Sequence, residues 1–167
     1  MHTPVIVLAG NPNVGKSSLF NALTQGNQHV GNWPGKTVKK MAGDLALNGR
    51  TATIIDLPGT YSLTAYSPEE TITRDFIITE KPDLIVNVVD ATNLERNLYL
   101  TVQLLELEMP LVIALTKCDL ATKQGLQINT GRLSATLQTP IITTIAARPS
   151  SLNDFRAYLH DYLVKQR

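Results

Sequence analysis

The chain has 167 residues, of which 43% are hydrophobic and 17% are charged, so it can form one domain with a sizeable core. Its formal net charge of +1 gives no electrostatic reason to expect a nucleic-acid or anionic-membrane partner. The single cysteine excludes an internal disulfide and favours a reducing, cytoplasmic compartment, and the apolar runs are far shorter than the roughly 20 residues that span a bilayer.

Strand-like and helical segments alternate along the chain. Short β-branched runs predict strands, Asn48-Gly49 predicts a hairpin turn, and apolar residues at a 3.6-residue spacing predict helices. The expected strands are residues 4–10, the two arms of a hairpin within 41–56, 83–90, 110–116 and 140–146. The expected helices are residues 16–24, 69–79, 95–108, 129–137 and 151–165. Residues 25–40 show neither period and are expected to be irregular, and residues 58–70 are rich in turn residues and are expected to form a long loop.

This order of elements predicts an α/β fold. Strands separated by helices form right-handed βαβ units, which give a mostly parallel sheet with helices on both faces. The single hairpin makes the six-stranded sheet mixed. No repeat or low-complexity segment interrupts the sequence, so residues 1–167 are expected to form a single domain.

A phosphate-binding motif lies between the first strand and the first helix. The sequence GNPNVGKS, residues 10–17, matches G-x-x-x-x-G-K-[ST]. In this motif backbone N–H groups and the helix N-terminus face phosphate oxygens, the lysine contacts the β- and γ-phosphates, and the hydroxyl binds Mg²⁺. The motif predicts a nucleoside triphosphate without naming its base. The expected phosphate-loop contacts are Gly10, Asn11, Pro12, Asn13, Val14, Gly15, Lys16, Ser17 and Ser18.

Two further motifs follow at strand ends. Asp56 in TIIDLPG is placed to hold Mg²⁺ through its water shell, and the Gly59 N–H can reach a γ-phosphate. In ALTKCD, Asp119 can accept two N–H groups of guanine, a pair that adenine cannot donate, so GTP is favoured over ATP. Lys117 would lie along the base, and Thr116 would tie this loop to the phosphate loop. Ordinary turns remain the alternative at both places.

Four segments carry a more specific resemblance, within the motif order of the translation-factor-like GTPases. They are GNPNVGKSSLFNALT, VGNWPGKTV, DLPGTYSL and NVVDATNLERNLYLTVQLLEL. Together they look like the N-terminal GTPase domain of the bacterial ferrous iron transport protein B family, over most of residues 4–120. The last segment is the most specific, because GTPase chemistry in general does not require it. The resemblance implies a Ras-like P-loop NTPase fold.

The resemblance implies two switch regions, at residues 28–40 and 56–70. Thr37 is similar to the threonine that closes over the nucleotide and completes Mg²⁺ coordination when a γ-phosphate is present. The implied Mg²⁺ ligands are therefore Ser17, Thr37 and Asp56.

A potassium ion is the second implied cation. No glutamine follows Gly59, and in the family K⁺ takes the charge-stabilising place. The matching ligands are Asn13 and the backbone carbonyls of Gly31 and Trp33. Trp33 is then expected to be an exposed lever that orders the loop, with packing against the domain as the alternative, and Asn13 could instead cap a turn. The implied catalytic residues are Lys16, Asn13, Thr37 and Gly59.

Two positions depart from the family pattern. Thr116 stands where the family usually has asparagine, and Ile145 stands where a serine is expected after the last strand. Ala146 could still offer its backbone N–H to the guanine O6. Both departures predict a looser grip on guanine and fast release of GDP.

The implied function is an intrinsically slow, Mg²⁺-dependent and K⁺-activated GTPase that regulates a ferrous iron permease. Its expected partners are guanine nucleotide and the permease domain of the same parent protein, without nucleic acid, at the cytoplasmic face of the bacterial inner membrane. A homo-oligomer of the parent is left open. In the family a helical domain and a membrane permease follow, and both are absent from this chain, which ends at Arg167. The alternative is a free-standing ribosome-assembly GTPase. A nucleotide-dependent interaction module and an ATPase or kinase also remain open.

Overall fold

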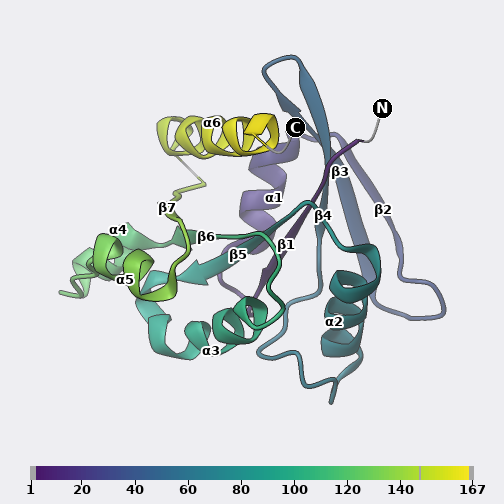
Figure 1. Ribbon diagram of the computed structural model, residues 1–167, viewed down its shortest axis with the longest axis horizontal. Coiled ribbons are helices and arrows are strands. Elements are labelled where there is room, and N and C mark those ends of the chain that lie inside the picture. The colour runs from purple at the N-terminus through teal and green to yellow at the C-terminus, as the bar shows by residue number, and fades with distance from the viewer. Residues whose placement is uncertain (1–2, 147, 166–167) are drawn as a thin grey trace.

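The computed structural model describes residues 3–146 and 148–165 as a mixed sheet with helices on both of its faces (Figure 1). The seven strands are β1 (Val5–Gly10), β2 (Gln28–Asn32), β3 (Lys39–Leu47), β4 (Arg50–Asp56), β5 (Leu84–Asp90), β6 (Leu111–Thr116) and β7 (Ile141–Thr143). The helices are α1 (Lys16–Thr24), α2 (Pro68–Glu80), the 3₁₀ helix η1 (Ala91–Asn93), α3 (Leu94–Leu105), α4 (Cys118–Lys123), α5 (Thr130–Leu137) and α6 (Pro149–Lys165). The α/β class is therefore confirmed.

The strand order is β2-β3-β4-β1-β5-β6-β7. Along the sheet, the neighbours β4-β1, β1-β5, β5-β6 and β6-β7 pair in parallel. The neighbours β2-β3 and β3-β4 pair antiparallel. The predicted hairpin turn lies between β3 and β4, where Asn48 and Gly49 have φ angles of 42° and 84°. Two consecutive positive φ angles are typical of the type I′ turn, which matches the twist of the strands that it joins.

One strand was not predicted, because the sheet has seven strands rather than six. The additional strand, β2, lies in the segment expected to be irregular and pairs with β3, for example His29 with Ala42. All but the first of its residues are exposed, so the strand has no buried face and no apolar alternation that would reveal it. Backbone pairing at the edge of the sheet forms this strand.

The core has two layers because alternate residues of a strand face opposite sides of the sheet. Ile6 and Leu8 of β1 face α1 and α6, where Phe20 and Phe155 are fully buried. On the other face, residues of β1 pack with buried side chains of α2 and α3 such as Leu100. The ends of β1, β4, β5 and β6 are thus fixed from both sides.

None of the helices in the described part of the chain has both the length and the apolar character needed to cross a membrane.

Candidate functional site

The phosphate loop is the turn from β1 into α1, and two of its glycines are required by its geometry. A Cβ atom on Gly10 would lie 2.6 Å from the Val88 carbonyl oxygen, and Gly15 has a left-handed φ of 93°. The loop lines a pocket of about 540 Å³, together with the first residues of α1, Gly59 and Lys117. Three separate segments therefore meet at one pocket.

Lys16, which lines this pocket, forms a buried ion pair with Asp56. The Lys16 ammonium group donates to Asp56 Oδ1 and, at 2.6 Å, to the Leu57 carbonyl oxygen. The Ser17 hydroxyl lies 3.5 Å from the other oxygen of Asp56. A hydroxyl and a carboxylate side by side are hard oxygen donors, which fit Mg²⁺. The phosphates of a nucleotide would compete with Asp56 for Lys16.

Gly59, at the start of the second switch, lies against the phosphate loop. A Cβ atom on Gly59 would come within 3.2 Å of Pro12 Cα, and the next N–H, that of Thr60, donates to the Gly10 carbonyl at 3.1 Å. The backbone of this segment therefore approaches the phosphate loop more closely than a Cβ atom would ordinarily allow.

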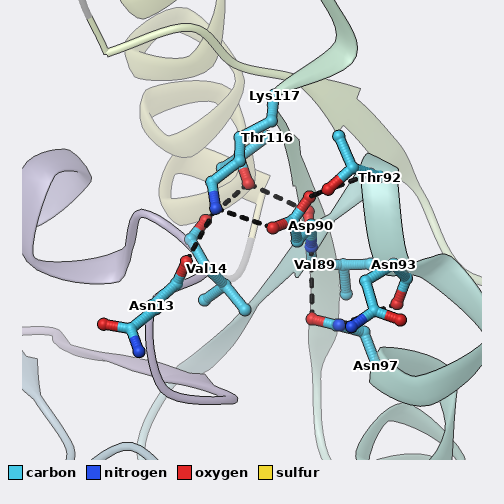
Figure 2. A network of polar contacts seen from close by, with 9 residues as sticks. All are labelled: Asn13, Val14, Val89, Asp90, Thr92, Asn93, Asn97, Thr116 and Lys117. Carbon is cyan, nitrogen blue, oxygen red and sulfur yellow. Dashed lines mark hydrogen bonds and ion pairs between the residues drawn. The ribbon is translucent and has the colours of Figure 1, made fainter. Parts of the chain in front are cut away.

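The loop after β6 is tied to the phosphate loop by two side chains (Figure 2). The Thr116 hydroxyl lies 2.6 Å from the Val14 carbonyl oxygen, to which it donates, and 3.1 Å from that of Val89. The Lys117 ammonium group donates to the Asn13 carbonyl at 2.7 Å. The tie expected of Thr116 is confirmed, and Lys117 adds a second one.

Asp90, at the end of β5, is a residue that motif reasoning did not single out. Its carboxylate accepts from Lys117 at 2.7 Å, and from the Thr92 hydroxyl and N–H at 2.6 and 2.8 Å. Burial raises the pKa of Asp90, but the hydrogen bonds from Lys117 and Thr92 and the Lys117 charge outweigh it, so the pKa is lowered. The available signal was its position at the carboxyl end of a buried strand, the same signal that identified Asp56.

The two remaining base-side residues lie outside the pocket lining. Asp119 is half-buried in the first turn of α4, and Ala146 follows β7. Next to Ala146, the Ile145 N–H donates to the Ser151 hydroxyl of α6 at 2.8 Å. A serine hydroxyl is thus present near the last loop, although it comes from the following helix and not from position 145.

Trp33 is buried, so the expectation of an exposed lever was wrong. Only 6% of its surface is accessible, and its ring meets Phe76 of α2 edge-on, with 5.2 Å between centroids and an interplanar angle of 73°. The Lys40 ammonium group lies 4.9 Å from the Trp33 ring centroid. Burial of the large apolar surface of the indole between the sheet and α2 is favourable, and this gain outweighs the tendency of the polar loop to stay exposed.

The other first-switch residues do not reach the pocket in this structure. Thr37 is exposed in the bend between β2 and β3, and none of Gly31, Trp33 and Thr37 lines the pocket in the described chain. Gly31 pairs with Lys40 in the sheet, and the Trp33 carbonyl accepts from the Lys36 N–H at 2.9 Å. The cation roles expected of these residues therefore require the first switch to move.

A family profile and a curated relative both match this sequence over most of its length. Residues 4–159 match the sequence profile of the family described as ferrous iron transport protein B. The Fe(2+) transporter FeoB of Escherichia coli K12 is 45% identical over 161 residues, which cover 94% of this chain and 21% of that protein. The chain thus spans about a fifth of the length of this curated relative. These matches do not favour the ribosome-assembly alternative.

Two solved structures agree over nearly the whole chain. The FeoB G-domain from Methanococcus jannaschii has a TM-score of 0.85 at 44% identity and covers 97% of this chain and 98% of its own. A mutant of S. thermophilus NFeoB, whose structure is bound to GDP, has a TM-score of 0.86 at 47% identity, covering 93% of this chain and 61% of its own. The chain therefore belongs to the ferrous iron transport protein B family, and its fold is that of the family's N-terminal G domain.

Proposed function

We propose that this domain binds GTP with Mg²⁺ and hydrolyses it slowly to GDP and phosphate, as the regulatory switch of a ferrous iron transporter. The observation that carries the proposal is the convergence of Lys16, Ser17 and Gly59 on one pocket, with Asp56 bonded to Lys16 behind it and the tied loop of Thr116 and Lys117 beside it. The GDP-bound S. thermophilus relative supports guanine nucleotide as the ligand.

Charge stabilisation is the main chemistry that these residues offer. In phosphoryl transfer to water, positioned cations and N–H groups stabilise charge that spreads over the γ-phosphate oxygens. Lys16 and the Gly59 N–H would contact those oxygens, and Ser17, Asp56 and, after the switch moves, Thr37 would hold Mg²⁺. Bound Mg²⁺ supplies further neutralisation of the phosphate charge. We assign no side chain as general base, and backbone groups of the loops would place the attacking water.

Guanine selection is assigned to the loop after β6. Asp119 would accept both the N1–H and N2–H of guanine, and it lies in the first turn of α4, which Lys117 precedes. The Ala146 N–H would face the guanine O6. Competition of GTP with ATP for the purified protein tests this assignment. Because ATP cannot make the paired contact with Asp119, GTP should bind more tightly by orders of magnitude.

Potassium activation is assigned to Asn13. Its backbone is left-handed, with φ at 62°, and its carbonyl is held by Lys117, so its side-chain amide oxygen is available as a ligand. A monovalent cation bound there would also take phosphate oxygens as ligands. Once the first switch moves, the carbonyls of Gly31 and Trp33 would become further ligands. It would add positive charge at a site where no glutamine follows Gly59.

The experiment compares GTP turnover in K⁺ and Na⁺ buffers for the wild-type chain, Asn13→Ala and Asn13→Asp. We expect wild-type turnover to be faster in K⁺, Asn13→Ala to lose that difference, and Asn13→Asp to keep part of it because an oxygen ligand remains. Equal rates in the two salts for the wild type would remove K⁺ from the proposal. Absence of any GTP hydrolysis in either salt would remove the enzymatic function.

In the parent protein, we place this domain at the cytoplasmic face of the bacterial inner membrane. The length of the curated relatives leaves room for a permease domain as its partner, and its own net charge of +1 favours no nucleic-acid partner. A homo-oligomer of the parent protein is compatible with this placement. Fast GDP release, expected from Thr116 and Ile145, would let the domain reset without an exchange factor.

A further inference from the structure

The family-specific segment from Asn87 to Leu107 places a row of polar side chains between β5 and α3. Its members are buried: Asn87 and Asp90 of β5, and Asn97 and Thr101 of α3. Buried polar groups are costly unless they are hydrogen-bonded. We call these four residues the buried polar row, and each of them has a partner in the structure.

One end of the buried polar row supports the strand before the phosphate loop. The Thr101 hydroxyl donates to Asn87 Oδ1 at 2.6 Å, and Asn87 Nδ2 donates to the Ala9 carbonyl at 3.3 Å. Ala9 directly precedes Gly10, the first residue of the loop. Helix α3 is thus connected to the phosphate loop through a buried side chain of β5.

The other end of the row fixes the carboxylate of Asp90. The Asp90 N–H donates to Asn97 Oδ1 at 3.2 Å, and Asn97 Nδ2 donates to the Asn93 carbonyl at 2.8 Å. The hydroxyl and N–H of Thr92 both donate to Asp90 Oδ1, which leaves Oδ2 for Lys117 (Figure 2). The carboxylate is therefore oriented by the two donors of Thr92, and the backbone of Asp90 is held by Asn97.

Lys117 connects this carboxylate to Asn13. Its ammonium group donates at 2.7 Å to Asp90 and at 2.7 Å to the Asn13 carbonyl. Both Lys117 and Asn13 have left-handed backbones, with φ at 57° and 62°. Such conformations cost energy in non-glycine residues and persist where the surroundings hold them. The Lys117 ammonium group, by its hydrogen bond to the Asn13 carbonyl, therefore holds these two left-handed residues together.

We propose that Asp90 is a positioning residue that fixes the Lys117 ammonium group between the guanine-side loop and Asn13, so that GDP retention and cation binding at Asn13 depend on the same carboxylate. This proposal rests on the proposed function for its nucleotide and its cation. Asp90 itself touches neither the nucleotide nor K⁺. It acts through Lys117, whose stem would lie along the base and whose ammonium group holds the backbone carbonyl of Asn13.

Removing the carboxylate should have two kinetic consequences. In Asp90→Ala, Lys117 regains rotamer freedom, and Asn13 loses a fixed donor on its carbonyl. We expect GDP to dissociate about tenfold faster and the half-saturating K⁺ concentration for GTP turnover to rise about tenfold, as for one lost charge-assisted hydrogen bond. The Lys117 side chain is 33% exposed, so water replaces part of the interaction and a larger effect is not expected.

Two milder variants and one control complete the experiment. Asp90→Asn keeps an oxygen acceptor, so both quantities should stay within about threefold of the wild type. Thr92→Val removes one donor to the carboxylate and should shift both quantities in the same direction, by less than Asp90→Ala. Asp44→Ala removes an exposed carboxylate of β3 and should change neither. Stopped-flow release of a fluorescent GDP analogue, GTP turnover against K⁺ concentration, and a urea unfolding midpoint are measured for each.

The outcomes separate a positioning role from a structural one. If Asp90→Ala unfolds at lower urea but leaves GDP release and the K⁺ half-saturation within about twofold of wild type, Asp90 is structural and the proposal is overturned. If GDP release alone changes, the coupling to the cation is overturned. If Asp90→Ala does not fold, unchanged GDP release and unchanged K⁺ half-saturation in Thr92→Val overturn the proposal. Wild-type turnover that ignores K⁺ defeats the proposed K⁺ role instead, while the GDP release rates still decide whether Asp90 acts through Lys117.

Discussion

The two sides of the candidate site are built by different interactions. On the polar side, Lys16, Thr116 and Lys117 are each fixed by hydrogen bonds to other loops. On the first-switch side, residues 28–32 are held by backbone pairing with β3, and Trp33 is packed on α2, while Thr37 is exposed nearby. The polar side is thus held by side-chain hydrogen bonds, whereas the first switch is held by backbone pairing at the sheet edge and by one buried aromatic side chain.

This difference suggests how the domain could change state. A directional hydrogen-bond network fixes one geometry, whereas apolar packing against a helix can be exchanged for another packing at modest cost. Under the proposed function the first switch would move for Thr37 to reach Mg²⁺, and the packing of the Trp33 ring on Phe76 is one contact that would have to shift. Because Phe76 belongs to α2, which follows the second switch, movement of one switch would be transmitted to the other.

The largest expected effect tests the polar side, through Lys16→Ala. GTP turnover should fall by about 10²–10³-fold, the usual loss when one transition-state donor is removed. The variant also leaves Asp56 buried without its partner, at a cost to the free energy of unfolding of about 3–5 kcal/mol. Turnover assays and urea unfolding measure the two effects.

A double variant separates these two effects of Lys16. Lys16→Ala with Asp56→Ala removes both buried charges, so the free energy of unfolding should recover part of the loss while turnover stays low. If the double variant is no more stable than Lys16→Ala, the ion pair does not organise the polar side, and the comparison between the two sides fails.

The second prediction tests the aromatic anchor of the first switch, Trp33. Trp33→Ala should lower the free energy of unfolding by about 3–5 kcal/mol, as for other buried aromatic residues. Phe76→Leu keeps an apolar partner and should cost about 1 kcal/mol, the value of an edge-on aromatic contact. Urea unfolding measures both variants.

Trp33 is also the only tryptophan, so its fluorescence reports on this anchor directly. On addition of Mg²⁺ and a non-hydrolysable GTP analogue, we expect its emission to shift in the wild type if the ring moves with the switch. In Phe76→Leu the shift should occur at lower nucleotide concentration, because the anchored state is weaker. An emission spectrum that is the same with and without nucleotide would mean that the anchor stays in place.

Sequence alone located the polar side because its chemistry requires residue types at fixed spacing. The phosphate loop, Asp56 and Thr116 could be assigned from motifs at strand ends, and the α/β order followed from apolar periodicity. Asp90 was missed as a site residue although it stands at the same kind of strand end. Its role depends on Lys117, which only the fold brings beside it.

The first switch could not be predicted in the same way. Its glycines, proline and polar residues indicate an irregular exposed loop, yet the backbone of residues 28–32 pairs with β3, and Trp33 is buried. Edge-strand pairing needs no apolar pattern, and the burial of Trp33 depends on Phe76, a residue distant in sequence. Long-range packing therefore overrode local composition.

The smallest expected effect concerns the second switch, which is held by hydrogen bonds like the polar side. Glu70 accepts from the Ser62 hydroxyl and the Tyr66 N–H, both at 2.9 Å, and its own N–H donates to the Ser67 hydroxyl at the start of α2. Burial raises the pKa of Glu70, but the hydrogen bonds from Ser62, Tyr66, Thr64 and Ser67 outweigh it, so the pKa is lowered. The charged form is therefore favoured in the folded state.

This lowered pKa gives the stability a pH dependence of known sign. A carboxylate whose folded pKa is depressed contributes stability above its unfolded pKa, about 4.3 for glutamate, and that contribution is lost as the pH falls through the folded pKa. Because water screens this group near the surface, Glu70→Gln should cost only about 0.5–1 kcal/mol in urea unfolding at pH 7, and progressively less below pH ~4. Glu69→Gln removes the neighbouring charge in the same helical turn, where the described structure gives the side chain no hydrogen bond, and is the matched control. If both variants show the same pH dependence, the effect comes from general charge in the first turn of α2, and the second switch is not held by the hydrogen bonds of Glu70.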